Sequence, residues 1–206
     1  MKHITEYKNI VFDMGCVLMD YDPDRSIRKY TSDPAIIREI RNTLFLSMEW
    51  LKLDCGLISE ETAIERVLPR LSSDEAREIA EKAFNHWDEY NMWIKDGAEE
   101  MIHKVHDRGQ KIYILSNASA RLPKIYRRVM PAAELYDGVF FSAEYQCIKP
   151  QDLIYQTFFK TFHLHPEDCF FIDDTPENIE ASRRNGMEGY VFSDGRIATL
   201  KRVLEF

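Results

Sequence analysis

The sequence contains no apolar run long enough to cross a membrane as a helix, which takes about 20 consecutive apolar residues. The first six residues, Met-Lys-His-Ile-Thr-Glu, also lack the apolar core of a secretory signal. We therefore expect a cytoplasmic protein with no membrane partner.

An excess of basic residues is also missing. The chain has 27 Lys and Arg against 35 Asp and Glu, which gives a formal charge of −8. Proteins that bind nucleic acid neutralise phosphates with Lys and Arg, so this balance argues against a nucleic-acid partner.

Cysteines are few, and none of them lies in a Cys-x-x-Cys pair. The four positions are Cys16, Cys55, Cys147 and Cys169. This spacing does not indicate a disulfide framework, so we expect reduced thiols, as is usual in the cytoplasm.

Internal repeats and low-complexity tracts are absent as well. The chain is 206 residues long and 45% hydrophobic, which is enough for a packed core. This length fits one domain with an insertion or two small domains, and it leaves the oligomeric state open.

Five short runs rich in Val, Ile, Phe and Tyr have the composition of strands. They are residues 10–13, 111–116, 138–141, 169–173 and 189–192. Helical apolar spacing occurs between them, at residues 96–108, 151–162 and 176–185. Because strands and helices alternate, we predict an α/β fold with a Rossmann-like parallel sheet.

One interval breaks this alternation. Between residues 20 and 91 the sequence has no convincing strand, and it has three helical patterns instead. We therefore predict an inserted helical cap domain at residues 20–94, and a core domain formed by residues 1–19 and 95–206.

The first helical pattern of the insert covers residues 34–53. Its inward face is expected to carry Ile36, Ile37, Ile40, Leu44 and Met48. Ser59 is expected to cap the second helix, and the third is expected within residues 72–87.

Adjacent carboxylates follow one of the predicted strands, at Asp173 and Asp174. Like charges so close together resist joint ionisation unless something positive lies between them. Asp13 ends another predicted strand and is followed by Gly15. Parallel strands bring their C-terminal ends to the crevice where α/β sheets bind ligands, so we expect a divalent cation with oxygen ligands there.

Four groups of residues stand at predicted strand ends: 13–18, 116–117, 149–150 and 173–174. In this order they resemble the motifs of the haloacid dehalogenase superfamily, whose members are mostly Mg-dependent phosphatases and phosphotransferases. The resemblance covers essentially the whole chain, including a helical cap after the first motif. Each motif is weak alone, and all four in order make a specific signal.

The resemblance implies a nucleophile and a metal site. Asp13 would attack phosphorus and become an aspartyl-phosphate. Its carboxylate would also bind Mg²⁺, together with the backbone carbonyl of Gly15. Asp174, and Asp173 directly or through water, would complete the protein's share of the ligands.

The resemblance also implies a phosphate site. Ser116 and Asn117 would bind phosphate oxygens, as would the backbone N–H groups after Asp13, beginning with Met14. Lys149 would act in catalysis and phosphate binding by offsetting the charge of the carboxylates and the phosphate.

Gly15 departs from the usual phosphatase pattern, which has a second Asp there as general acid and base. A positioned general acid is typically worth about 10²–10⁴-fold in rate. Asp20 or Asp22 could replace it, the substrate could have a good leaving group, or turnover could be weak. A bacterial sugar-phosphate phosphatase branch resembles this chain in its Asp-x-Gly motif followed by Asp-x-Asp.

These observations predict Mg²⁺-dependent hydrolysis of a small phosphate monoester, with a sugar phosphate as one candidate substrate. One alternative is a non-catalytic protein that binds a phosphate metabolite. Another is a metal-independent haloacid dehalogenase, which also lacks the second Asp. That alternative is disfavoured because the pair Asp173 and Asp174 would then have no cation between them.

Other conspicuous residues have simpler interpretations. Cys16 is expected to be a small filler, either buried or at the edge of the site, and not a nucleophile. The histidine pairs are expected to be structural, and the aromatic group to pack the cap. These sets are His103, His106, His163 and His165, and Phe84, Trp87, Tyr90 and Trp93. Residues 54–59 form either an ordinary helix-helix turn or, as the resemblance implies, a substrate-specificity loop.

Overall fold

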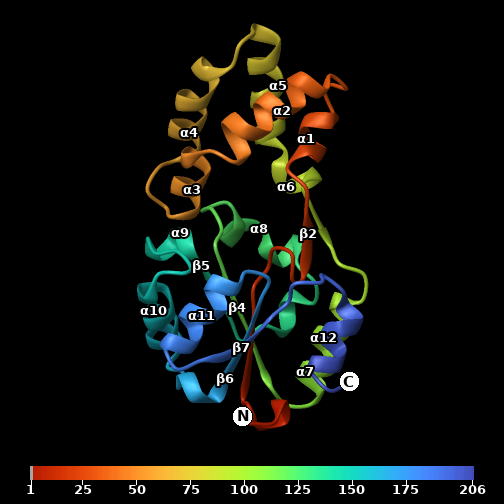
Figure 1. Ribbon diagram of the computed structural model, residues 1–206, viewed down its shortest axis with the longest axis vertical. Helices are drawn as coiled ribbons and strands as arrows, with labels where there is room; N and C mark the ends of the chain where they lie inside the picture. The colour runs from red at the N-terminus through yellow and green to blue at the C-terminus, as the bar shows by residue number, and fades with distance from the viewer. Residues whose placement is uncertain (1) are drawn as a thin grey trace.

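Five parallel strands form the central sheet, in the order β5-β4-β1-β6-β7 (Figure 1). The computed structural model describes residues 2–206 of the chain. The strands are β1 (Asn9–Phe12), β4 (Lys111–Ser116), β5 (Gly138–Phe141), β6 (Cys169–Asp173) and β7 (Glu188–Val191). They match the five predicted runs to within one residue at each end, so the predicted parallel α/β fold is confirmed.

Helices cover both faces of the sheet. They are α7 (Ala98–Asp107), α8 (Leu122–Val129), α9 (Ser142–Tyr145), α10 (Asp152–Phe162), α11 (Pro176–Arg184) and α12 (Ile197–Val203). Successive residues of a strand point to opposite faces. Accordingly, Val11 of β1 joins an apolar cluster with Phe158 of α10, whereas Phe12 joins another with Met101 of α7.

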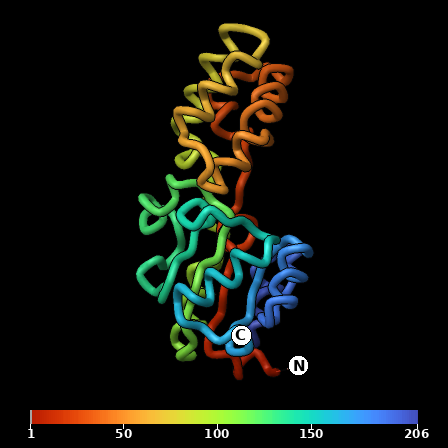
Figure 2. Tube along the Cα trace, turned by 90° about the vertical axis from the view of Figure 1, so that its left-hand side faces the viewer, coloured from red at the N-terminus to blue at the C-terminus, as the bar shows by residue number. Residues whose placement is uncertain are grey.

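A block of helices stands beyond one end of the sheet (Figures 1 and 2). It contains α1 (Asp24–Arg28), α2 (Pro34–Ile40), the π-helix η2 (Arg41–Phe45), α3 (Met48–Asp54), α4 (Glu60–Val67), α5 (Asp74–Asn85) and α6 (Trp87–Tyr90). Ser59 caps α4 by accepting a hydrogen bond from the Thr62 N–H, as expected.

The expectation of one helix over residues 34–53 is wrong. The segment turns into a π-helix after Ile40 and then breaks, and Ser47 caps the new helix α3 with its hydroxyl group. Because the break changes the helical phase, Met48 does not point inward and its side chain is 60% exposed. Ile40 and Leu44 are buried as expected.

Two short strands join the helical block to the core, and the sequence analysis missed both. β2 (Met19–Tyr21) pairs antiparallel with β3 (Met92–Ile94). Three residues are too few for a clear alternation of apolar and polar side chains. The ribbon lies where the insert was expected to begin and end, and we propose that the two domains join there.

Arg121, at the start of α8, connects the core to the helical block. Its guanidinium donates to both carboxylate oxygens of Glu60, at 2.8 and 2.9 Å, and to Asp88 at 2.7 Å. It also lies over the rings of Phe84 and Trp87, 5.6 and 5.3 Å from the centroids. One side chain therefore holds α4, α5 and α6 against the core.

Within residues 2–206, no helix combines the length and the apolar character that crossing a membrane would require. The four cysteines are all free.

Replacing Arg121 with Ala should destabilise the protein by about 1–3 kcal/mol, because the largely buried Asp88 loses its partner at 2.7 Å and keeps only Arg128, at 3.5 Å. The thermal midpoint should fall by about 2–4 °C for each kcal/mol. Arg127→Ala is the matched control, since Arg127 is exposed on the same helix. Equal midpoints for the two variants would show that Arg121 does not hold the helical block in place.

Candidate active site

The expected residues meet at the C-terminal edge of the sheet. Asp13 directly follows β1, Ser116 ends β4 and Asp173 ends β6. β4 and β6 are the two neighbours of β1 in the sheet, so these three positions are necessarily adjacent. Lys149 arrives from the loop between α9 and α10.

Lys149 lies between two carboxylates. Its ammonium nitrogen is 2.6 Å from Asp173 Oδ2 and 3.0 Å from Asp13 Oδ1. The residue is only 4% exposed. A buried charge is tolerated where it is paired and hydrogen-bonded, and here each of the three charges has such a partner.

Asn117 holds the loop that carries Lys149. Its amide oxygen accepts the Lys149 N–H at 2.8 Å, and its amide nitrogen donates to the Lys149 carbonyl at 3.0 Å. The side chain of Asn117 is thus engaged with the backbone of Lys149. Its expected role in binding phosphate stays a prediction.

Asn178 is a site residue that the sequence analysis missed. Its amide nitrogen lies 2.9 and 3.1 Å from the two carboxylate oxygens of Asp173. The Thr175 N–H adds a third hydrogen bond to Asp173 at 2.8 Å. Asn178 lies two residues after Pro176, which begins α11. This position could have indicated that the Asn178 side chain faces back toward the end of the strand.

The first loop of the core positions Asp13. The Met14 N–H donates to Asp13 Oδ1 at 2.7 Å, so this group is directed at the carboxylate. The Met14 carbonyl accepts from the N–H groups of Leu18 and Met19, which closes the loop. Gly15 lines the cavity above, and a Cβ atom added there would have no heavy atom within 4 Å.

Burial and charge together set the protonation of the site. Burial raises the pKa of Asp13 to about 6, although the Lys149 ammonium opposes the shift. Burial alone would lower the pKa of Lys149, but the carboxylates of Asp13 and Asp173 raise it instead. Burial, followed by the nearby Asp173 charge, raises the pKa of Asp174. Three carboxylates and one ammonium give the site a formal charge of −2, so its net charge is negative.

The donor set fits a hard divalent cation. Asp13, Asp173 and Asp174 each offer an oxygen, and these oxygens lie within 4.8 Å of one another. No other cluster of three or more acidic, His or Cys side chains with this geometry occurs in the part of the chain that the structure describes. Carboxylate oxygens are the ligands that Mg²⁺ prefers.

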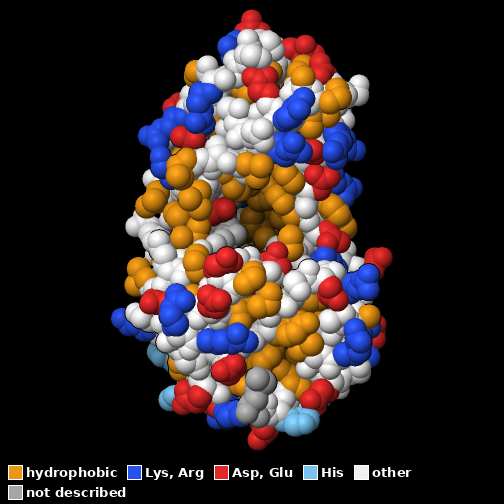
Figure 3. Space-filling model, in the orientation of Figure 1, with side chains coloured by type: hydrophobic (Ala, Val, Ile, Leu, Met, Phe, Trp, Pro, Cys, Tyr) orange, Lys and Arg blue, Asp and Glu red, His pale blue; other side chains and the backbone are white. Residues whose placement is uncertain are grey.

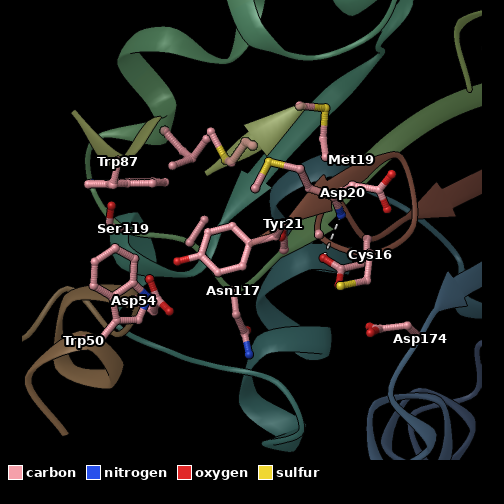
Figure 4. Close-up of a pocket in the computed structure, with 17 residues that line it drawn as sticks. Cys16, Met19, Asp20, Tyr21, Trp50, Asp54, Trp87, Asn117, Ser119 and Asp174 are labelled. Atoms are coloured by element: carbon pink, nitrogen blue, oxygen red, sulfur yellow. Dashed lines mark hydrogen bonds between the residues drawn. The ribbon is translucent and has the colours of Figure 1, made fainter. Parts of the chain in front are cut away.

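A cavity of about 270 Å³ opens above the carboxylates, between the core and the helical block (Figure 3). Its apolar walls include Trp50, Trp87, Met92 and Leu122. Asp54, Tyr21 and Ser119 also line it, at the side opposite Asp174 (Figure 4). The sequence analysis assigned no role to Trp50, Tyr21 or Ser119.

Only one member of the segment 54–59 reaches this cavity, and it is Asp54. Among the two acidic residues considered as replacement acids, Asp20 lines the cavity and pairs with Lys95. Asp22 does not line it and instead pairs with Arg28, at 3.1 Å.

The remaining conspicuous residues lie mostly outside the site. Burial and the neighbouring Asp174 and Asp13 carboxylates raise the pKa of Cys16 to about 11, so its thiol stays protonated at neutral pH. The side chains of His103, His106, His163 and His165 are exposed and belong to no cluster of metal-binding type. In the aromatic group, Trp87 is buried and lines the cavity, whereas Trp93 is 38% exposed.

Comparison with known proteins gives a family and a fold. Residues 7–186 match the family model of the haloacid dehalogenase-like hydrolases. D-ribitol-5-phosphate phosphatase of Bacteroides thetaiotaomicron is 23% identical over 200 residues, which cover 91% of this chain and 93% of that protein. A sesquiterpene phosphatase of Aspergillus oryzae is 23% identical over 192 residues, 92% of each chain.

A crystal structure from Bacteroides thetaiotaomicron has a similar fold. It is a mutant of a haloacid dehalogenase family enzyme in complex with magnesium and inorganic phosphate. The TM-score is 0.71 at 20% identity, over 92% of this chain and 96% of that one.

Asp54→Asn should stabilise the protein increasingly as the pH rises. Burial raises the pKa of Asp54 to about 7, so the folded protein binds this proton more tightly than the unfolded chain, where the pKa is about 4. Between these two pKa values the Asp54 carboxyl ionises more readily in the unfolded chain, so the wild type loses stability as the pH rises. The neutral Asn side chain of the variant does not ionise, so the variant does not lose this stability. The nearby Tyr21 and Cys55 have raised pKa values and stay neutral in this window.

Thermal midpoints of wild type and Asp54→Asn at pH 4.5 and pH 8 check this expectation. The advantage of the variant should be several degrees larger at pH 8. A constant difference would mean that Asp54 ionises at an ordinary pKa.

Proposed function

The chain belongs to the haloacid dehalogenase-like hydrolase family, and we propose that it hydrolyses a small phosphate monoester with the help of Mg²⁺. The observation that carries the proposal is the buried Asp13–Lys149–Asp173 arrangement with Asp174 beside it. In this arrangement the Asp13 carboxylate lines the cavity, and the three carboxylates leave an excess negative charge that a cation can neutralise. A phosphate ester and Mg²⁺ are the ligands that such a site favours.

Asp13 is the proposed nucleophile. One of its carboxylate oxygens forms a bond to phosphorus while the bond from phosphorus to the ester oxygen breaks. The electron pair leaves with the alcohol oxygen, which takes up a proton. A water molecule then attacks phosphorus in the aspartyl-phosphate, and inorganic phosphate departs as the Asp13 carboxylate is restored.

Asp13, Asp174 and the backbone carbonyl of Gly15 are the proposed metal ligands, with Asp173 contributing directly or through water. Bound there, Mg²⁺ supplies positive charge to the phosphate oxygens. The hydrogen bonds from Lys149, Asn178 and Thr175 hold Asp173 in place, so Asp173 also positions the lysine. Lys149 itself offsets charge as phosphorus is attacked.

The phosphate oxygens are assigned to Ser116, Asn117 and the loop that begins with Met14. Ser116 and Asn117 line the cavity beside Asp13. The Asn117 side chain is held by Lys149, so its contribution comes from backbone groups and from placing the lysine.

Proton delivery to the leaving alcohol is the weak step of this mechanism. Gly15 offers no acid, and the Asp20 carboxylate is engaged in an ion pair with Lys95. Among esters that bind equally well, one whose leaving group needs little protonation, such as an anomeric sugar phosphate, should be hydrolysed fastest at such a site.

Two relatives support a phosphatase. The names of both include a phosphatase activity, and the similar structure holds magnesium and phosphate. A metal-independent dehalogenase fits less well, because Asp174 would stay beside Asp173 without a cation. A phosphate-binding protein without turnover is the remaining alternative.

Asp13→Asn should lower the rate of p-nitrophenyl phosphate hydrolysis by about 10³-fold or more, because the nucleophile is removed. EDTA should have the same effect on the wild type, and added Mg²⁺ should reverse it. Asp152→Asn, an exposed carboxylate on α10, is the control. Activity that persists in EDTA would contradict the metal-dependent mechanism, and no activity with any ester would favour the phosphate-binding alternative.

Gly15→Asp should raise kcat/KM for alkyl phosphates by about 10²-fold and change p-nitrophenyl phosphate hydrolysis little, because only the alkyl leaving group needs a proton. The backbone at Gly15 is outside the left-handed region and the position is open, so an Asp side chain fits. Gly15→Asn has the same size without the acid and is the control. Equal gains on both esters, or a gain with Asn, would show that the missing acid does not limit the rate.

A further inference from the structure

Three polar side chains lie together at the far end of the cavity from Asp174 without partners (Figure 4). The Tyr21 hydroxyl and the Ser119 hydroxyl are buried and have no hydrogen-bond partner among residues 2–206. Within the same residues, the Asp54 carboxylate makes no hydrogen bond and no ion pair. The amide nitrogen of the neighbouring Asn91 also has no hydrogen-bond partner among these residues, whereas its amide oxygen accepts from the Ser26 N–H.

Unpaired buried polar groups are rare, because folding removes them from water without compensation. Two of them lie here, the Tyr21 and Ser119 hydroxyls, and the half-buried Asp54 carboxylate is a third polar group without a partner; the three come from separate elements. Tyr21 ends β2, Asp54 ends α3, and Ser119 lies in the loop between β4 and α8. Their convergence on one cavity indicates that a ligand supplies the missing hydrogen bonds.

Asp54 is held at the cavity by contacts with the core. The Ser142 hydroxyl donates to the backbone carbonyl of Asp54 and accepts from the Ala118 N–H. Two residues later, Gly56 lies so close to Ala143 that a Cβ atom would be 2.1 Å from its carbonyl oxygen. The turn after α3 is therefore seated on α9, which fixes where the Asp54 side chain can point.

The surrounding walls are apolar. Trp50 and Trp87 lie at this end of the cavity (Figure 4), and Met92 and Leu122 also line the cavity. The rings and aliphatic chains can cover the C–H groups of a carbon chain, while the three polar groups can bind its hydroxyls. Sugars and polyols present both kinds of surface.

We infer that Asp54, Tyr21 and Ser119 form a hydroxyl-binding subsite, so that the substrate is the phosphate ester of a polyol or sugar with a free hydroxyl remote from the phosphate. This inference rests on the proposed phosphatase function. Asp54 accepts hydrogen bonds, and the two hydroxyl groups can donate or accept. A hydroxyl group of the ligand also does both, whereas an ammonium group only donates and would leave the hydroxyl protons of Tyr21 and Ser119 unpaired.

A matched set of five-carbon phosphates tests the subsite. A pentitol 5-phosphate, n-pentyl phosphate and 5-aminopentyl phosphate have the same chain length and differ in polar groups. The wild type should hydrolyse the pentitol ester with a kcat/KM at least about 10²-fold above the pentyl ester, because the latter leaves buried groups unpaired.

Conservative variants identify the residues responsible. Asp54→Asn, Tyr21→Phe and Ser119→Ala should each lower kcat/KM for the pentitol ester by about 10-fold or more, and should leave the pentyl ester within about 3-fold of wild type. Glu65→Gln, an exposed carboxylate on α4, is the control and should change neither. Circular dichroism verifies that each variant is folded.

Binding separates this inference from the proposed function. Calorimetry with the Asp13→Asn protein and Mg²⁺ measures the affinity for the pentitol and pentyl esters without turnover. A preference for the pentitol ester that Asp54→Asn removes supports the subsite even if the wild type hydrolyses nothing. Equal affinities, unchanged variants, or a preference for the aminopentyl ester would overturn it, the last in favour of a cation site.

Discussion

The ammonium of Lys149 between Asp13 and Asp173 is the interaction on which the rest of the site depends. None of these three buried groups would be stable as a lone charge. Their contact requires β1 and β6 to be neighbours and the loop before α10 to fold back over both. Asn117 and Asn178 complete the arrangement by fixing the two sides of it.

A surplus of negative charge remains after this pairing. Asp174 has no cationic partner of its own among the described residues, and burial raises its pKa. An anionic phosphate would be repelled from such a site unless a cation arrived first. In the proposed mechanism, metal binding and substrate binding are therefore coupled, because the charge that repels a phosphate is the charge that Mg²⁺ would neutralise.

The two ends of the cavity differ in how well their polar groups are satisfied. At the sheet edge, Asp173 has four hydrogen-bonding contacts and is held rigidly. At the other end of the cavity, the side chains of Asp54, Tyr21 and Ser119 have none within the described chain. The hydrogen bonds to Asp173 hold its carboxylate and the Lys149 ammonium in one geometry. The unpaired side chains of Asp54, Tyr21 and Ser119 lower the stability of the free protein but are available to bind a ligand. Arg121 and the Gly56–Ala143 contact hold this end of the cavity against the core.

The sequence alone was enough to predict the order of the five core strands and of the helices α7, α10 and α11 between them, the presence of a helical block, and the strand-end positions of Asp13, Ser116 and Asp173. These follow from local apolar periodicity and from the rule that parallel strands end at one edge. Three features emerge only from the folded chain: Asn117 and Asn178 hydrogen-bond to Lys149 and Asp173, the segment 34–53 breaks, and Asp54 shares a cavity with Ser119. Those facts depend on packing between segments far apart in the chain, which no local pattern encodes.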